Sequence, residues 1–224
     1  MFIMTQSAAR IDFQDLEAST VRLNDIAHAL SWVNRYTGHA AFGFSVAAHS
    51  LAISYFLEKR GESAAVQMGG LMHDAHEAYF GDVSTPLKKY LDVVPELRTL
   101  GVTQEQIDKF QLAFRAREDA VQDMVAKKLG IDVSLTRHPA VKKADLIALY
   151  VERYALLPPD EPGEGPWPII AGITPDMCKG MAAPVKGLAP EAVAKVFVAR
   201  FHELEAKMAA EEADARKAGY LFGP

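Results

Sequence analysis

Cysteine, long apolar runs and export signals are scarce or missing in this chain. Cys178 is the only cysteine, which excludes an internal disulfide and best fits a reducing compartment. No apolar run approaches the roughly 18–20 residues of a membrane span. The N-terminus lacks the basic region and apolar core of a signal peptide. We therefore expect a cytoplasmic protein without membrane association.

Positive charge is also in short supply. The chain has 24 Lys and Arg against 29 Asp and Glu, giving a formal net charge of -5, and no run of Lys or Arg stands out. This argues against a protein that binds nucleic acid through a basic surface. A small phosphorylated substrate is still compatible, because it needs only one or two local cations.

Helical periodicity dominates the sequence, and it contains no convincing strand. Residues 1–20 look like an irregular lead-in, Asn24 is a plausible N-cap for the first helix, and Gly38 ends that helix. Thr103-Gln-Glu-Gln106 has the spacing of a capping box. We therefore expect an all-α bundle. The expected helices cover about 24–37, 45–59, 63–80, 87–90, 104–129, 139–156 and 190–218.

We expect the 224 residues to form a single domain, whose helical core covers about 20–156. Residues 158–190 hold most of the prolines, which excludes a continuous helix there. Because Trp167 and three isoleucines give this segment apolar groups to bury, we interpret it as an ordered surface excursion. A long C-terminal helix follows at about 191–218. Its apolar stripe comprises Val193, Val196, Phe197, Phe201 and Leu204.

The chemically most unusual stretch is residues 73–82, His-Asp-Ala-His-Glu-Ala-Tyr-Phe-Gly-Asp. It places two imidazoles and three carboxylates on one helix and the loop after it, and most of the surrounding residues are apolar. Burying His, Asp and Glu together is costly unless they are paired or hold a metal. The stretch therefore indicates an enzyme.

His49, His73, Asp74 and Asp145 each fall on an expected helix among apolar neighbours. The adjacent pair at 73 and 74 can meet at one ion that lies beside the helix, and two glycines one turn earlier allow another helix to approach closely. Two imidazoles and two carboxylates suit Mn, Fe, Co, Ni or Zn rather than Ca. A satisfied core histidine at 49, and an Asp145 paired with Lys142 on the helix surface, are the alternatives.

Four motifs resemble those of the HD-domain phosphohydrolases: Ala-His-Ser at 48–50, His-Asp-Ala-x-Glu at 73–77, Gly-Asp-Val-x-Thr-Pro-Leu-Lys at 81–88 and Val-Lys-x-Ala-Asp at 141–145. The pattern is most similar to the bacterial HD-type 5′-deoxynucleotidases and related phage deoxynucleotide triphosphohydrolases. The resemblance implies that His49, His73, Asp74 and Asp145 bind one divalent transition metal ion. Since relatives commonly assemble as dimers or higher oligomers, it also implies a homo-oligomer.

Two further carboxylates are candidate catalytic groups. Glu77 lies four residues after His73 on the same helical face, where it can reach a water at the metal without being a ligand. In the resembled nucleotidases the matching Glu orients or deprotonates that water. Asp82 follows the helix-ending Gly81, and the resemblance supports contact with a sugar hydroxyl or assistance to the leaving oxygen. A salt bridge from Glu77 to a surface lysine and a loop-capping Asp82 are the alternatives.

Asn-Arg-Tyr at 34–36 resembles an Asn-Arg-Trp stretch of the deoxynucleotidases. The resemblance implies that Arg35 holds the phosphate, for which its forked donors are well suited. Tyr36 stands where those relatives have Trp and could pack on the sugar or the base.

Four more residues are candidate substrate contacts. Thr85 and Pro86 shape a loop whose counterpart in relatives lies along the nucleoside. Lys88 is a second candidate for the phosphate, with a solvated helix lysine as the alternative. His76 is placed either near the substrate or in a surface or supporting role.

The expected function is thus metal-dependent hydrolysis of a small-molecule deoxynucleotide at its 5′ phosphoester. A monophosphate would give deoxynucleoside and phosphate, whereas a triphosphate such as dATP would give deoxynucleoside and triphosphate. The competing class is a non-catalytic helical module, in which the metal is structural or the site senses a nucleotide.

Overall fold

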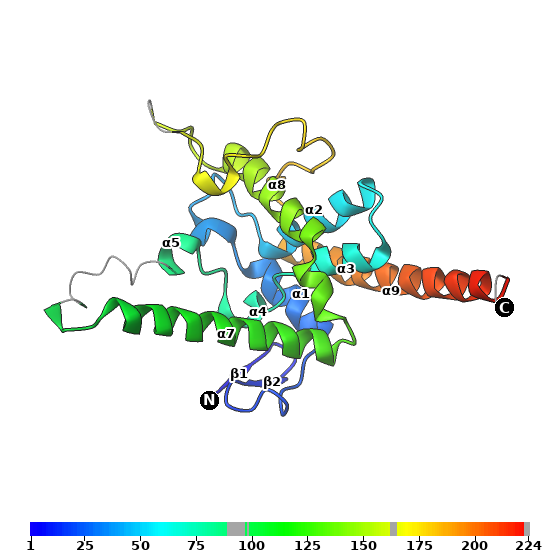
Figure 1. Ribbon diagram of the computed structural model, residues 1–224, viewed down its shortest axis with the longest axis horizontal. Coiled ribbons are helices and arrows are strands. Elements are labelled where there is room, and N and C mark those ends of the chain that lie inside the picture. The colour runs from blue at the N-terminus through cyan, green and yellow to red at the C-terminus, as the bar shows by residue number, and fades with distance from the viewer. Residues whose placement is uncertain (89–96, 98, 162–164, 222–224) are drawn as a thin grey trace.

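The computed structural model describes residues 1–88, 97, 99–161 and 165–221, and most of these residues are helical, which confirms the all-α class (Figure 1). Within this part of the chain no helix is long and apolar enough to cross a membrane. The α-helices are α1 (Leu23–Trp32), α2 (Val46–Lys59), α3 (Ala64–Met72), α4 (Glu77–Phe80), α5 (Thr85–Lys88), α7 (Gln104–Lys128), α8 (Pro139–Leu156) and α9 (Pro190–Leu221). Short 3-10 helices are η1 (Arg35–Gly38), η3 (Val133–Arg137) and η4 (Pro168–Ile170).

The N-terminal segment is a small hairpin, so the prediction of an irregular lead-in without strands was wrong. Strands β1 (Phe2–Met4) and β2 (Arg10–Asp12) pair antiparallel. Each has only three residues, which is too short for alternation to register as a period. The buried carboxylate of Asp25 in α1 ties down the connecting loop, because it accepts hydrogen bonds from the hydroxyls of Thr5 at 2.7 Å and Ser7 at 2.5 Å.

Helix boundaries agree with the sequence prediction where a local cap sets them. The Ser45 side chain caps α2, and both hydrogen bonds of the capping box between Thr103 and Gln106 form at the start of α7. The prediction failed for α1, which begins after Arg22 rather than at Asn24 and ends at Trp32. It stops early because Val33 and Asn34 adopt extended backbone conformations, with ψ of 113° and 136°. Tyr36 and Thr37 in η1 are then left-handed, with φ of 59° and 53°.

The core lies where α2 and α3 pack against α1, α8 and α9 (Figure 1). The two glycines of α3 permit the close approach that the sequence predicted. A Cβ on Gly69 would lie 2.3 Å from the backbone oxygen of Leu135, and one on Gly70 would lie 2.5 Å from Cδ1 of Leu57. On α9 the predicted apolar stripe is buried except at Val196, which is 45% exposed.

The proline-rich segment is ordered over the residues that the structure describes. Ile170 is buried, and the guanidinium of Arg153 binds the backbone oxygen of Pro158 at 2.5 Å and the carboxylate of Asp160. The same guanidinium lies 5.2 Å from the ring centroid of Trp167. These contacts hold the excursion against the C-terminal end of α8.

Candidate metal centre

The helix that was predicted over residues 63–80 is interrupted at the centre of the site. α3 ends at Met72, and residues 73–76 form a turn before α4. Within the turn the backbone bonds join residues three apart, from Ala75 N to Met72 O and from Glu77 N to Asp74 O. This tightening brings adjacent side chains together, so that His73 Nε2 lies 3.0 Å from Asp74 Oδ2. A regular helix would direct them about 100° apart.

The four predicted metal ligands converge from three separate parts of the chain. His49 on α2 is fully buried, and its Nε2 lies 3.8 Å from Asp74 Oδ2 and 3.2 Å from Asp145 Oδ1 on α8. His73 Nε2 is 4.0 Å from the same oxygen of Asp145. One ligand atom each from His49, His73 and Asp74 lies within 4.8 Å of the others, so this cluster could hold a metal ion.

The hydrogen bonds of His49 and His73 show which nitrogen of each imidazole is left to bind a cation. His49 Nδ1 lies 2.5 Å from Glu152 Oε1, and His73 Nδ1 lies 2.9 Å from the backbone oxygen of Gly70. The backbone oxygen of Gly70 can only accept a hydrogen bond, and the same holds for Glu152 when it is ionised. Each Nδ1 is therefore the donor. Each Nε2 is buried and makes no well-formed hydrogen bond within the described residues, despite the carboxylate oxygens nearby. Buried, partnerless imidazole nitrogens beside carboxylates fit a metal ion.

The electrostatics of the cluster favour positive charge. Burial lowers the pKa of His49, as does Arg35, but Glu152 and Asp145 outweigh them and raise that pKa to about 9. Burial also lowers the pKa of His73, and Asp74 more than reverses this shift. Although burial raises the pKa of Asp74, the two imidazoles pull it well below its ordinary value. Protons or a divalent ion can supply the charge that these carboxylates attract.

Glu77 lies close enough to the cluster for the charges of Asp74 and Arg35 to act on its carboxyl group. It is 7% exposed, and its Oε2 is buried without a hydrogen-bond partner among the residues that the structure describes. The alternative was a salt bridge from Glu77 to a surface lysine. Lys88 does not form it, because its ammonium group lies 2.9 Å from Glu118 instead. Burial and the charges of Asp74 and Asp82 raise the pKa of Glu77 to about 10. A cation in the cluster would lower that pKa.

Arg35 and Tyr36 are both hydrogen-bonded to Glu152, a residue that was not predicted from the sequence. Glu152 Oε2 accepts hydrogen bonds from Arg35 Nε at 2.8 Å and from the Tyr36 hydroxyl at 3.1 Å. Arg35 Nη1 lies 4.0 Å from Asp74 Oδ2, so its outer nitrogens are beside the ligand cluster. A signal for Glu152 was present, since this acidic residue falls on the apolar stripe of α8 between Ala148 and Leu156.

Of the remaining predicted contacts, His76 lies in the turn, whereas Asp82, Thr85 and Pro86 follow α4. Thr85 and Pro86 are exposed and begin α5, so the loop predicted to run from Asp82 to Pro86 is limited to residues 81–84. Of the short helix predicted over 87–90, the last two residues lie outside the described part of the chain. Asp82 is half-buried, and burial raises its pKa. His76 Nδ1 lies 3.2 Å from Gln122 Oε1 on α7.

Comparison with known proteins gives relatives without a stated activity. No family model matches the sequence. The chain is 29% identical over 203 residues to the uncharacterized protein YfdR of Escherichia coli K12, covering 91% of this chain and 95% of that protein. It is 34% identical over 86 residues to an uncharacterized protein of Rhodobacter capsulatus, covering 37% of this chain and 44% of that protein. Any assignment of function therefore depends on the geometry of the site.

Proposed function

We propose that the protein is a metal-dependent phosphohydrolase of the HD type that cleaves the 5′ phosphoester of deoxynucleotides. The observation that carries this proposal is the pair of buried Nε2 atoms of His49 and His73, which face the carboxylates of Asp74 and Asp145 but make no well-formed hydrogen bond in the described structure. The order of these ligands in the chain, and the motifs around them, resemble the HD phosphohydrolases and support the same conclusion.

In this proposal the two histidines and two aspartates hold one divalent ion of the Mn, Fe, Co, Ni or Zn type. When bound, such an ion supplies Lewis-acid chemistry that polarises a phosphoryl oxygen and makes water a better nucleophile near neutral pH. Glu77 takes the proton from the attacking water, since its buried Oε2 has no hydrogen-bond partner in the described structure. The outer nitrogens of Arg35 neutralise the phosphate, while Glu152 fixes the rest of its guanidinium.

The proposed reaction is a displacement at the α-phosphorus. The water oxygen bonds to phosphorus, the bond from phosphorus to the 5′ oxygen breaks, and that oxygen leaves as the hydroxyl of the deoxynucleoside. Burial favours the protonated form of Asp82, which suits it to donate the proton that the leaving oxygen needs. The other product is phosphate from a monophosphate or triphosphate from a triphosphate.

Release of phosphate and triphosphate from all four deoxynucleoside monophosphates and triphosphates, with Mn²⁺ or Co²⁺, tests the proposal. Ribonucleotides serve as controls for the sugar. We expect Glu77→Gln to lower turnover by about 10²–10⁴-fold, as loss of a general base does, while the bound metal content stays the same. Glu191→Gln, at an exposed position of α9, is the matched control and should retain activity.

Two results would contradict the proposal. One is that no deoxynucleotide is hydrolysed although the protein binds the metal, which is the outcome expected of a structural or sensing module. The other is hydrolysis at the wild-type rate by Glu77→Gln.

A further inference from the structure

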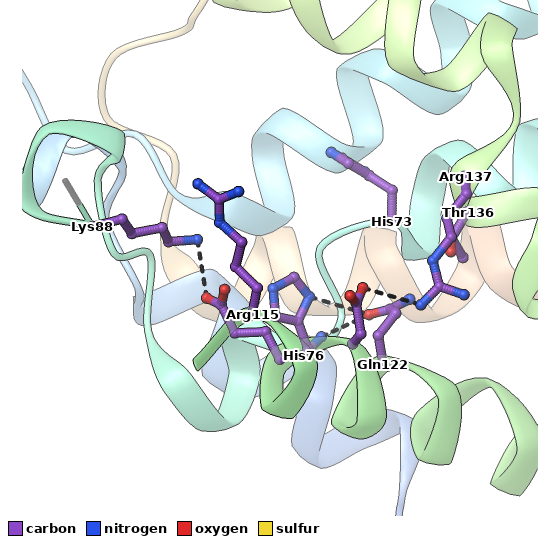
Figure 2. A pocket seen from close by; sticks show the side chains of 9 residues that line it. His73, His76, Lys88, Arg115, Gln122, Thr136 and Arg137 are labelled. Atoms are coloured by element: carbon purple, nitrogen blue, oxygen red, sulfur yellow. Dashed lines mark hydrogen bonds and ion pairs between the residues drawn. The ribbon is translucent and has the colours of Figure 1, made fainter. Parts of the chain in front are cut away.

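A pocket of about 340 Å³ adjoins the candidate metal centre on the side of α7 (Figure 2). His73, whose Nε2 belongs to the ligand cluster, lines this pocket together with His76 from the same turn. A substrate held at the metal can therefore extend past the two imidazoles into the pocket. The remaining lining residues are Lys88, Arg115, Glu118, Asp119, Gln122, Thr136 and Arg137.

Three cations line this pocket, and they differ in whether a carboxylate is already paired with them. In Figure 2, Lys88 and Arg115 lie on one side and Arg137 lies on the other. The Lys88 ammonium is 2.9 Å from Glu118, and Arg137 Nη2 is 3.2 Å from Asp119 as well as 2.7 Å from Asp123 on α7. Arg115 is exposed and forms no ion pair or hydrogen bond within the described residues, so its full set of donors is available to a ligand.

The carboxylates in the pocket do not exclude an anion. Glu118 and Asp119 are each already paired with a cation, and Arg137 is shared between Asp119 and Asp123, so Arg115 is the cation of the pocket that has no carboxylate partner among the described residues. Phosphate oxygens are strong acceptors for arginine and lysine, and a bidentate arginine contact adds both energy and geometric specificity. The pocket thus offers one free guanidinium, flanked by two further cations.

A nucleobase would find little to recognise it in this pocket. No Phe, Tyr or Trp is among the described residues that line it, so the rings available for stacking are the imidazoles of His73 and His76. The side-chain amide that could read a base is already engaged, because Gln122 Nε2 donates to the backbone oxygen of Met72 at 2.8 Å and its Oε1 accepts from the backbone N–H of His76 at 3.0 Å. The available chemistry favours phosphate over base.

We propose that this pocket binds the β- and γ-phosphates of a deoxynucleoside triphosphate, with Arg115 as their principal contact. The inference rests on the proposed function and narrows its substrate class to triphosphates. The α-phosphate then lies at the metal cluster, the nucleoside lies on the other side of that cluster, and the phosphate chain runs past His73 and His76. Lys88 contacts the same phosphates from α5.

Steady-state kinetics of Arg115→Ala with Mn²⁺ test the proposal on a deoxynucleoside triphosphate and on the matching monophosphate. Losing a hydrogen bond to a charged group should raise the KM for the triphosphate by about tenfold or more and leave the monophosphate kinetics unchanged. Arg117→Ala is the matched control, since this arginine is exposed on the same helix but does not line the pocket. It should leave both substrates unaffected.

Calorimetric binding of inorganic triphosphate to the Mn²⁺-loaded protein gives a readout apart from turnover. We expect Arg115→Ala, but not Arg117→Ala, to weaken this binding by about tenfold. Unchanged triphosphate kinetics and binding in Arg115→Ala would overturn the inference, as would an equal effect on monophosphate and triphosphate. If the wild type hydrolyses monophosphates alone, the inference fails while the proposed function stands. If it hydrolyses no deoxynucleotide, the proposed function itself fails.

Discussion

Glu152 connects three residues around the candidate metal centre. One of its oxygens meets His49 Nδ1, and the other accepts hydrogen bonds from Arg35 and Tyr36. A carboxylate in this position fixes the ring of a metal-binding histidine, so that its Nε2 faces the ion. In the proposed function, Glu152 is thus a positioning residue for both the metal ligand His49 and the phosphate contact Arg35.

We expect Glu152→Gln to weaken Mn²⁺ binding by about 10–100-fold, as loss of such a partner does in metal sites. Isothermal titration of the folded variant measures the affinity, and Glu191→Gln serves as the exposed control. A variant that unfolds more easily yet binds Mn²⁺ with wild-type affinity would show that Glu152 only stabilises the fold.

The residues of the site differ in how far sequence could predict them. His73, Asp74 and Glu77 lie together in one apolar stretch. The sequence alone therefore shows that ionisable side chains occur where burial is expected. Asp145 was grouped with His73 and Asp74 because it falls on an expected helix among apolar neighbours, and the resemblance then implied that it binds the metal. The contact between His49 and Glu152 joins residues 103 positions apart, and only the packing of α2 against α8 brings them together.

Among the elements, local signals set the ends of α2, α7 and α8, and these were predicted correctly. The ends of α2 and α7 depend on side-chain caps within the same segment. The break between α3 and α4 has no proline and no glycine at residues 73–76, so the periodicity suggested a continuous helix. That break is what allows His73 and Asp74 to face one point.

The hairpin β1–β2 gives a prediction for the pH dependence of stability. Burial raises the pKa of Asp25, but the hydrogen bonds from Ser7 and Thr5 outweigh it and hold the pKa below its ordinary value of 3.8. Its contribution is therefore complete above that ordinary value, and it is lost as the pH falls through the folded value. Asp25→Asn should destabilise the fold by about 1–3 kcal/mol at pH 7.

Urea unfolding of the wild type and Asp25→Asn across a pH series measures this difference. We expect the gap between the two proteins to narrow as the pH falls below the ordinary pKa of aspartate. A gap that stays constant into acid would contradict the role of the ionised carboxylate. Asp176→Asn, at an exposed position of the proline-rich segment, controls for a general effect of charge.

At the scale of the whole molecule, the ligand cluster joins α2, the turn after α3, and α8. These elements come from distant parts of the sequence and meet at the centre of the fold. Helical periodicity was sufficient to predict the all-α class, because the class depends only on local patterns repeated along the chain. The pocket beside α7 could not be predicted in that way, since its lining combines side chains from residue 73 to residue 137.

The most direct test of the account is calorimetric titration of Mn²⁺ into the metal-stripped, full-length protein. We predict about one ion per chain for the wild type and for the exposed control Asp176→Asn. Asp74→Asn loses a ligand charge and should bind Mn²⁺ about 10–100-fold more weakly. Binding should also raise the melting temperature, because the ion binds only the folded state. A wild-type protein that binds no divalent ion, or an Asp74→Asn variant that binds as tightly as the wild type, would contradict the account.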